Sequence, residues 1–545
     1  MAALPENKSD LLQRRVIQAA IAVTLLGFLA RLWTASGTFL NPDEALHFRL
    51  ANQTSLALAY KGSLTAAHPP LLILLLYFWH ALGTSELWLR LPSVIAGAFF
   101  CWMFYKWLSS ATGRLTGFIG LLFVAFLPPV ILIAAEVRQY SPLLAFLAAA
   151  LYFLDEAFAV NSAVRMAAFS ICLYFAMLFH YSAFLFASAL GIYALVQIFA
   201  QRPPARVIVV WTIGQCLALG LGLVLYKTHL SRLGVGDSRT AMQGWMSEFY
   251  LHRSYFDSTH DNPFLFIVGH SFGVFQYFFG QLAVGDVMGI LFIVGIIILI
   301  RGKVRLPLRT STGAWIVFLI LPFAIAGASS LAHIYPYGGT RHVALLIIPG
   351  IAGVSVAIVR LANDNWKRAI GASTLILAAC LAFGKPRPPR IERADQSRAH
   401  MAAAMQFVSQ NVSPSDIIFT DYQSDLILGH YLCQQRPIPI DPAPVGYEQF
   451  SCAGHRVVSD DFKTAWQFFA EDFPKHWQEL VQTYNLKPGH TVWVFQAGWG
   501  VDLAEPLKKH YAELRDLQYE SFGKNIEVFK LTVGQSIPAA VNNAQ

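Results

Sequence analysis

Two adjacent carboxylates, Asp43 and Glu44, follow the first long apolar run of the chain, within the segment from Gly37 to His47. A carboxylate just beyond a membrane span is solvated and can accept a proton as a general base. The alternative is that Asp43 caps a helix beginning at Glu44, because Asn-Pro-Asp is a common turn before a helix. A capped carboxylate is also a well-placed base. We therefore treat Asp43 as the first catalytic candidate, with Glu44 beside it.

A second group of reactive side chains is formed by Glu136, Arg138 and Tyr140, shortly after Pro128 and Pro129, which bend or end a helix. It combines an acid, a guanidinium and a phenol at the expected membrane surface. The structural alternative is an interfacial ion pair beside a tyrosine of the aromatic belt. A catalytic role requires Glu136 to face the same cavity as Asp43.

A third group lies in the turn from His333 to His342, which is unusually polar for a connection between two apolar runs. Its glycines let the backbone approach a ligand closely. Arg341 offers a fork of donors that matches phosphate, although an arginine at a helix end can also snorkel to the interface. Tyr337 and His342 are candidates for the wall of a substrate pocket, together with Tyr140.

Further basic residues could hold a phosphate. The complete set of expected phosphate-binding residues is His68, Arg90, Arg138, Lys227 and Arg341. A divalent metal held by Asp43 and Glu136 could serve the same purpose. Because basic candidates are plentiful, we expect that no cofactor is required, with a divalent metal as the less favoured alternative.

The composition places all of these residues in a membrane protein. Of 545 residues 55% are hydrophobic and only 13% are charged, and the mean hydropathy is +0.48. The net charge of +8 suits contact with anionic lipid, but it is explained first by where Lys and Arg stand along the chain. The run from Val16 to Trp33 has no cleavage pattern after it, so it is expected to stay as a membrane anchor.

Eleven apolar runs are long enough to cross the bilayer. They are 16–33, 90–108, 115–135, 141–158, 166–181, 183–200, 206–226, 285–300, 314–332, 341–360 and 367–384. Two more runs, 69–83 and 263–283, are ambiguous. If both lie in the interface, every basic cluster falls on the side of the N-terminus, as expected of cytoplasmic loops. We therefore predict eleven spans and two interfacial helices, with thirteen spans as the alternative.

The C-terminal part reads as a soluble α/β domain that begins after a proline-rich, basic linker from Lys385 to Arg390. Helices are expected over 399–410 and 462–484, and strands over 416–420, 491–496 and 525–531. The part shows no phosphate loop and no nucleophile elbow, so we expect a cap or an acceptor-docking module. It also contains Cys433 and Cys452, natural disulfide partners if it faces an oxidising compartment. The other four cysteines lie in apolar runs and are expected to pack.

Taken together, these motifs resemble those of the C-type glycosyltransferases that use polyprenyl-phosphate sugars, especially the lipid A aminoarabinose transferases and the protein O-mannosyltransferases. The resemblance covers about residues 10–385. It rests on the run Asn41 to Glu44, the run His68 to Pro70, the stretch from Gly83 to Ser93, the run Glu136 to Pro142 and, more loosely, Gly339 to His342. The chain departs from the aminoarabinose transferases in having His68 in place of a lysine, and Ser141 in place of an aspartate, so that any second acidic role falls to Glu136.

The resemblance implies a polytopic helical fold, with a transmembrane domain over 1–386 and a periplasmic α/β domain over 387–545. It implies an outward-facing cavity in which Asp43 deprotonates the acceptor while basic residues hold the lipid-linked phosphate, in an inverting displacement. The expected partners are a polyprenyl-phosphate sugar, a lipid or glycan acceptor and the bilayer, without nucleic acid. The expected location is a bacterial inner membrane with the N-terminus in the cytoplasm.

Two alternatives remain open at this stage. One is a protein O-glycosyltransferase of the same fold. The other, from a different class, is a transporter or flippase of a lipid-linked substrate. Transporters usually place ionisable residues at mid-membrane depth, whereas the runs from residue 285 onward are nearly free of charge at their centres and the ionisable residues gather at one face. This distribution favours chemistry at a membrane surface.

Overall fold

The computed structural model describes residues 8–233, 251, 253–302, 311–383, 396–433, 438–469, 471–499, 503 and 518–534. The chain divides into two compact units. The first, the membrane unit, comprises residues 1–36 and 55–388, and the second, the sheet unit, comprises residues 37–54 and 389–545. The expected transmembrane domain, 1–386, includes residues 37–54. Residues 37–54 instead group with the C-terminal domain, because a helix in this segment packs and forms ion pairs there.

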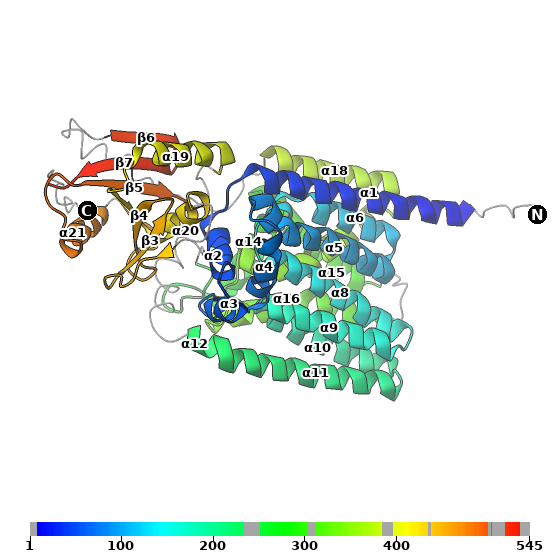
Figure 1. Ribbon diagram of the computed structural model, residues 1–545. Coiled ribbons are helices and arrows are strands. Elements are labelled where there is room, and N and C mark those ends of the chain that lie inside the picture. Colours follow the sequence, from blue (N-terminus) through cyan, green and yellow to red (C-terminus); the bar gives the residue numbers. More distant parts are fainter. Residues whose placement is uncertain are drawn as a thin grey trace, which may run out of the picture. The chain divides into compact units, whose positions relative to one another are not determined.

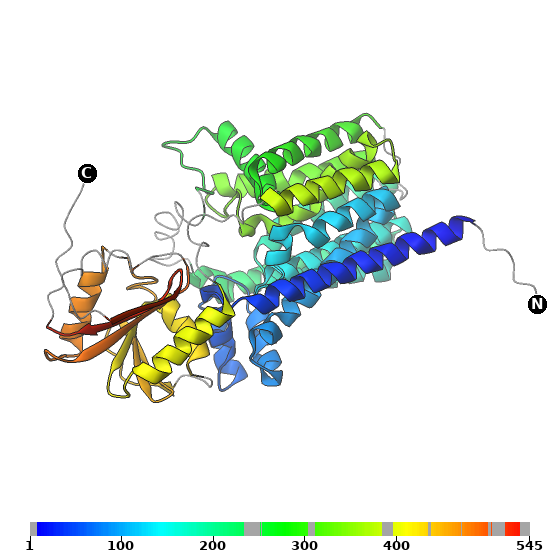
Figure 2. The ribbon, with the colours of Figure 1, turned by 90° about the horizontal axis from the view of Figure 1, so that it is seen from above.

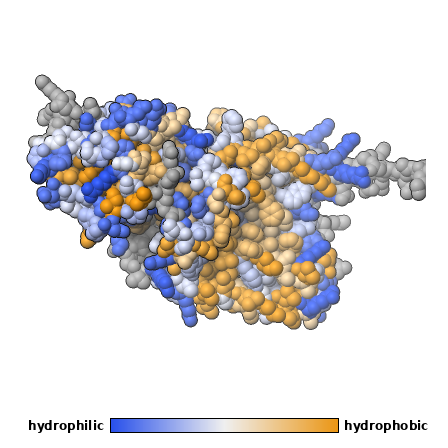
Figure 3. All heavy atoms as spheres, in the orientation of Figure 1, coloured by the Kyte–Doolittle hydropathy of each residue, from blue (hydrophilic) through white to orange (hydrophobic). Residues whose placement is uncertain are grey.

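The membrane unit is a bundle of helices (Figure 1). Its elements are α1 (Lys8–Gly37), α3 (Leu56–Ser63), α4 (Leu71–Trp79), η1 (His80–Leu82), α5 (Glu86–Thr112), α6 (Arg114–Phe126), α7 (Pro128–Leu132), α8 (Tyr140–Ala159), α9 (Ala163–Phe179), α10 (Ser182–Gln201), α11 (Ala205–Leu225), η2 (Tyr226–Leu230), α12 (Ser231–Leu233), α14 (Pro263–Phe279), α15 (Leu282–Ile300), α16 (Thr312–Leu331), η4 (Arg341–Leu346), α17 (Ile347–Leu361) and α18 (Trp366–Phe383). Helix α17 lies almost wholly inside the bundle. In Figure 3 apolar residues dominate the visible surface of these helices, as expected of a surface that faces lipid.

Nine helical segments of the described residues are long and apolar enough to cross a membrane, two fewer than the sequence predicted. The other two expected spans, 115–135 and 166–181, correspond to α6 with 13 residues and α9 with 17. Helix α6 ends early because Leu127 precedes two prolines and adopts an extended conformation. Helix α9 lies at the lower limit for a span.

The first of the two ambiguous runs has features of an interfacial helix. The helical segment Leu71–Leu82 is short, and twelve residues would reach only about 18 Å of the roughly 30 Å needed to cross. Helix α14 meets the end of α16, where Ile267 lies against Gly327, and the start of α17, where Phe278 lies against Gly350. Helix α14 also packs antiparallel to the first half of α15, where Gln276 lies against Gly285 and Phe272 against Gly289. With 17 residues it lies at the lower limit for a span.

The sheet unit contains a seven-stranded mixed sheet in the order β2-β3-β4-β1-β5-β7-β6. Its strands are β1 (Ile417–Thr420), β2 (Ile438–Pro439), β3 (Tyr447–Cys452), β4 (His455–Asp460), β5 (Thr491–Ala497), β6 (Gln518–Gly523) and β7 (Ile526–Thr532), and its helices are α2 (Pro42–Ala51), α19 (Arg398–Asn411), α20 (Tyr422–Tyr431) and α21 (Phe473–Thr483). Strand β1 is parallel to both β4 and β5, and the other pairs are antiparallel.

Helices cover both faces of this sheet (Figure 2). Phe473 and Trp477 of α21 belong to the hydrophobic core with Phe419 and Val494 of the sheet. Phe407 of α19 contacts Trp493, which points to the opposite face. The expected α/β class is therefore confirmed. Helix α20 and strands β2, β3, β4 and β6 were not predicted from the sequence.

The helix expected over 462–484 is confirmed only at its end, as α21. The Asp461 side chain accepts hydrogen bonds from the backbone N–H groups of Lys463 and Thr464, which forms a turn instead of a helical start. The helix begins beside Pro474, a residue suited to the first helical turn.

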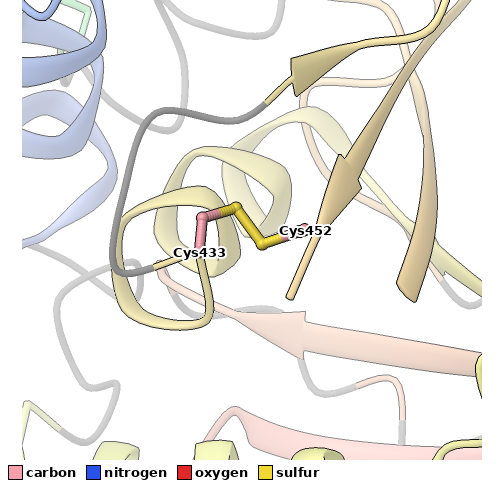
Figure 4. Close-up of a disulfide and its surroundings, with 2 residues drawn as sticks. All are labelled: Cys433 and Cys452. Atoms are coloured by element: carbon pink, nitrogen blue, oxygen red, sulfur yellow. A yellow bond between two sulfur atoms is a disulfide. The ribbon is translucent and has the colours of Figure 1, made fainter. Parts of the chain in front are cut away.

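The predicted disulfide between Cys433 and Cys452 is present (Figure 4). It joins the residue just beyond α20 to the end of β3, across a sequence separation of 19 residues. The other four cysteines are free, and Cys101 and Cys380 are buried, as expected of packing residues.

Candidate functional site

Several predicted residues of the membrane unit meet where α8 begins. The turn before this helix is fixed to α5, because Ser93 donates a hydrogen bond to the carbonyl oxygen of Arg138 (3.1 Å) and Ser141 donates to that of Ser93 (2.7 Å). Two small hydroxyls thereby hold the segment that carries Glu136, Arg138 and Tyr140. The segment is irregular backbone at a fixed position, a common setting for functional side chains.

The acid and the guanidinium predicted from separate motifs lie side by side. The nearest nitrogen of Arg341 is 3.9 Å from a carboxylate oxygen of Glu136, and the two side chains are 12% and 28% exposed. Partial burial strengthens the interaction of both charges with each other and with a ligand. The pair therefore presents an acid and a phosphate-matching cation at one place in the membrane unit.

Aromatic side chains surround the start of α8. The ring of Tyr140 lies 5.1 Å from that of His180 and 6.5 Å from that of His342, and the Arg138 guanidinium lies 5.7 Å from the Tyr140 ring centre. Tyr335 completes the group, 6.3 Å from His180 and 6.4 Å from His342. We call Tyr140, His180, Tyr335 and His342 the aromatic cluster.

His68 joins the aromatic cluster from the chain before α4. Its ring stacks on that of His180 at 5.3 Å, and the Gln139 amide nitrogen lies 2.9 Å from His68 Nε2. His68 therefore belongs to the same group of packed rings as His180 and Tyr140.

The His180 imidazole is neutral. Its Nδ1 accepts the backbone N–H of Ser182 (3.0 Å), and burial, together with the charge of Arg138, lowers its pKa to about 3. The sequence analysis had given His180 no site role, because a histidine at the end of an apolar run usually packs. Tyr335 and Gln139 were likewise outside the predicted site. The sequence contained little indication of His180, Tyr335 and Gln139, because the three segments that carry them meet only in the folded chain.

Two buried polar atoms of this region have no hydrogen-bond partner among the described residues: the hydroxyl oxygen of Tyr140 and the amide oxygen of Gln139. Tyr140 is only 1% exposed and Gln139 is fully buried. Buried polar groups are nearly always satisfied, so such orphans mark places where water or a ligand binds. These two atoms lie in consecutive residues beside the Glu136 and Arg341 pair.

Three other candidates have different surroundings. Arg90 is buried and donates a hydrogen bond to the carbonyl oxygen of Ala35 at the end of α1 (2.8 Å). Tyr337 is buried and its hydroxyl lies 2.6 Å from that of Ser271, and burial raises its pKa to about 12. Lys227 lies in the π-helix η2 with an exposed side chain, and no described contact joins it to the aromatic cluster.

The first acidic motif lies in the sheet unit, on α2. The cap of this helix is Asn41, not Asp43: the Asn41 side chain accepts the N–H of Glu44 (3.1 Å), and the Glu44 carboxylate accepts the N–H of Asn41 (3.0 Å). This reciprocal capping box occupies Glu44, which is fully buried. Asp43 lies in the first turn and is partly exposed. Glu44 thus has a structural role, and Asp43 is the carboxylate of the pair that remains partly exposed.

A metal site would need several ligands close together. The described residues contain no group of three or more His, Cys, Asp or Glu side chains that could hold a metal ion. Among the described residues, the charged groups of this region that lie close together are Glu136 and Arg341.

The chain was compared with known protein families and structures. Residues 67–226 match the family model described as dolichyl-phosphate-mannose-protein mannosyltransferase. The crystal structure of ArnT from Cupriavidus metallidurans bound to undecaprenyl phosphate matches with 13% identity and a TM-score of 0.51, covering 96% of this chain and 99% of that one. The apo state of the same protein matches with 11% identity and a TM-score of 0.52, covering 97% and 99%.

A weaker likeness, with a TM-score of 0.43 and 10% identity, is found to the archaeal oligosaccharyltransferase AglB from Archaeoglobus fulgidus in complex with an inhibitory peptide and a dolichol-phosphate, covering 87% of this chain and 69% of that one. A comparison with curated protein sequences found no match. The likeness to ArnT over nearly the whole of both chains shows that the chain has the C-type glycosyltransferase fold. The expected resemblance to this family and its fold class are thereby confirmed.

Proposed function

We propose that the chain is a membrane glycosyltransferase that moves a sugar from a polyprenyl-phosphate donor to a hydroxyl group of a lipid or glycan acceptor. The observation that carries the proposal is the Glu136 and Arg341 pair beside the aromatic cluster, within a C-type glycosyltransferase fold. The related ArnT structure contains undecaprenyl phosphate, which supports a donor of the same class.

The reaction requires two kinds of help. The acceptor oxygen forms a bond to the anomeric carbon while the bond from that carbon to the phosphate oxygen breaks, and the electron pair leaves with the phosphate. Arg341 stabilises the growing negative charge on the departing phosphate, because a guanidinium donates two parallel hydrogen bonds to such a group. Arg138 adds a second positive charge nearby. Removal of the acceptor proton by a carboxylate completes the step.

Two carboxylates are available for the proton. Asp43 remains the proposed base because of its sequence motif, and Glu136 is the second acidic group, held beside Arg341. A direct displacement inverts the anomeric configuration. Since Arg341 supplies the positive charge in this mechanism, we propose that transfer needs no divalent metal. Measuring transfer in excess EDTA tests this part of the proposal.

The location follows from the disulfide and the basic residues. A structural disulfide persists in oxidising compartments, so the Cys433 and Cys452 bridge supports a sheet unit outside the cytoplasm. The basic residues near the N-terminus, Lys8, Arg14 and Arg15, support a cytoplasmic N-terminus. We therefore place the reaction on the outer face of a bacterial inner membrane.

The test is transfer of radiolabelled sugar from a panel of polyprenyl-phosphate sugars to lipid acceptors by the purified protein. Wild type is compared with Asp43→Asn, Glu136→Gln and Arg341→Ala. A matched control is Glu156→Gln, since Glu156 also pairs with an arginine, Arg165, at the other end of α8. We expect loss of transfer in the first three variants only. Equal turnover by wild type and Arg341→Ala would reject the phosphate-binding role, and equal turnover by Asp43→Asn would reject Asp43 as the base.

A protein acceptor is the second candidate, supported by the description of the family model that matches residues 67–226. The same assay distinguishes the two candidates when peptides with serine and threonine are offered beside lipid and glycan acceptors. Label in peptide alone would establish protein O-glycosylation in place of the lipid or glycan acceptor.

A further inference from the structure

Helix α2, which carries Asp43, is bound to the C-terminal domain although about 370 residues separate the two in the sequence. The backbone N–H of Phe39 donates to the carbonyl oxygen of Gln396 (3.0 Å), and Thr38 and Ser397 form an antiparallel β-bridge. The backbone N–H of Leu40 donates to the hydroxyl of Tyr431 at the end of α20 (2.7 Å). The chain entering α2 is therefore attached before the helix begins.

The far end of α2 is held by charge. Arg49 lies 2.6 Å from a carboxylate oxygen of Asp425 in α20 and 2.5 Å from one of Glu448 in β3. Asp425 is only 1% exposed and Arg49 is one-third exposed, whereas Glu448 is 39% exposed. Burial opposes the charge of Arg49, but the two carboxylates raise its pKa above the ordinary value. Ser459 donates a further hydrogen bond to Asp425 (3.2 Å). We call Arg49, Asp425 and Glu448 the ionic clamp.

Ring and backbone contacts lie between these two attachments. Phe48 packs edge-on against His430 of α20 at 5.0 Å. At the first turn, the Cγ of Pro42 would lie 3.0 Å from a Cβ atom at Gly498, just after β5. Gly498 also has a φ of +127°, so two independent constraints require glycine at that position. Asp43 follows Pro42 directly, so the absence of a side chain at position 498 leaves room for the turn that carries Asp43.

Helix α2 has only ten residues, too few to be stable alone in water. Its capping box orders the first turn, but the position of the helix as a whole depends on the surface that it contacts. That surface belongs to the C-terminal part of the sheet unit, where α20 and β3 lie. Removing Arg49 alone would leave the buried Asp425 carboxylate without its cation. An uncompensated buried charge lowers the stability of the folded state.

We propose that the C-terminal domain is the module that positions the base: it holds α2 through the ionic clamp, and Arg49 is a positioning residue for Asp43. The catalytic consequence rests on the proposed function, whereas the docking of α2 does not. In this account the domain contributes to transfer by fixing a segment from the other end of the chain, and its own strands contribute no reactive group.

Docking is tested by hydrogen exchange on the full-length protein in detergent. We expect the amides of residues 44–51 to exchange at least about tenfold faster in Arg49→Gln than in wild type, while α19 and β5 are unchanged. Arg456→Gln is the matched control, because that guanidinium lies against Gln449 and Tyr484, away from α2. Unchanged protection of α2 in Arg49→Gln would overturn the clamp.

Arg49→Gln could also destabilise the domain through the orphaned Asp425. The double variant Arg49→Gln with Asp425→Asn removes both buried charges, and Glu448 is exposed enough to be solvated. We expect the double variant to regain the wild-type melting temperature while α2 still exchanges fast. Recovery of slow exchange along with stability would show that the clamp does not hold the helix.

Catalysis provides the second readout. We expect Arg49→Gln to lower kcat by about ten- to a hundredfold with the KM for the donor unchanged, and Arg49→Lys to recover part of the loss. A disulfide between cysteines at positions 38 and 397, a pair close enough to be bridged, should restore kcat in Arg49→Gln under oxidising conditions. Wild-type kcat in Arg49→Gln with fast-exchanging α2 would overturn the positioning role. Absence of transferase activity in wild type would reject the proposed function and leave the exchange result to decide docking.

Discussion

The two ends of α8 carry similar residues but differ in how completely their polar groups are satisfied. At the C-terminal end, Asp155 accepts hydrogen bonds from Trp107 Nε1 (2.9 Å) and from the Tyr193 hydroxyl (2.6 Å), and Gln197 donates to Tyr193 in turn (3.2 Å). These hydrogen bonds join α5, α8 and α10. This end is a closed network whose role is to hold the bundle together.

At the N-terminal end of α8 the buried Tyr140 hydroxyl has no partner among the described residues. Glu136 and Arg341 lie 3.9 Å apart beside it. An acid, an arginine and a tyrosine are thus present at both ends. If the N-terminal end binds the donor, as we propose, the satisfaction of polar groups separates a binding region from a structural one better than residue type does.

The largest contrast is expected between the two arginines. Arg341→Ala should lower kcat/KM by about 10²- to 10³-fold, because removing one preorganised donor to a developing anion typically costs that much. Arg165→Ala, at the other end of α8, should leave it within about twofold. Steady-state transfer assays on both variants measure the effect. Equal losses would mean that the two ends are not functionally distinct.

The two glutamates give the next contrast. Glu136→Gln should reduce transfer by about ten- to a hundredfold, since it removes the proposed second acidic group without changing the shape of the side chain. Glu156→Gln, which loses its pairing with Arg165, should alter stability by less than about 1 kcal/mol and leave transfer unchanged. If Glu136→Gln is as active as wild type, the second acidic role is removed from the mechanism.

The two tyrosines should respond in opposite ways. Tyr193→Phe removes a partner of the buried Asp155 and should destabilise the protein by about 1–3 kcal/mol without lowering the activity of the folded fraction. Tyr140→Phe removes a hydroxyl that has no described partner, so it should leave the melting temperature unchanged and raise the KM for the donor a few-fold. Thermal unfolding and kinetics on the same preparations check both. Destabilisation by Tyr140→Phe would place its hydroxyl in a closed network after all.

The smallest effect concerns pH. Because burial and Arg138 lower the pKa of His180 to about 3, the unfolded chain binds a proton at this residue between about pH 6.5 and 3 and the folded chain does not. Stability from His180 is therefore complete above about pH 6.5 and is lost as the pH falls, on the order of 1 kcal/mol per pH unit. Melting temperatures between pH 4.5 and 7.5 should show a steeper acid decline in wild type than in His180→Gln. Identical slopes would contradict the neutral, buried histidine.

Much of the fold could be predicted from sequence because hydrophobic length alone defines membrane spans. Two of the expected spans correspond to helices shorter than 18 residues, in one case for an identifiable reason, since Pro128 ends α6 early. In the sheet unit, strands such as 491–496 were visible as runs of β-branched and aromatic residues. Helix α20 was not visible, because its polar face is buried against neighbours that are distant in sequence.

The candidate site could be predicted in part. Glu136 and Arg341 were both predicted site residues, from separate motifs, and the fold brings them together. His180 and Tyr335 were not predicted as site residues, because their importance comes from three segments that meet only in space. The attachment of α2 to the C-terminal domain was also invisible, since nothing in the local sequence of Arg49 indicates partners at positions 425 and 448.

The most direct test of the central claim is photo-crosslinking of the intact protein with a polyprenyl phosphate that carries a diazirine near its phosphate, followed by peptide mapping. The account predicts label on peptides that contain residues 133–142 or 335–346, reduced in Arg341→Ala and unchanged in Arg165→Ala. Label confined to peptides around residues 155–165, or insensitive to the loss of Arg341, would contradict it.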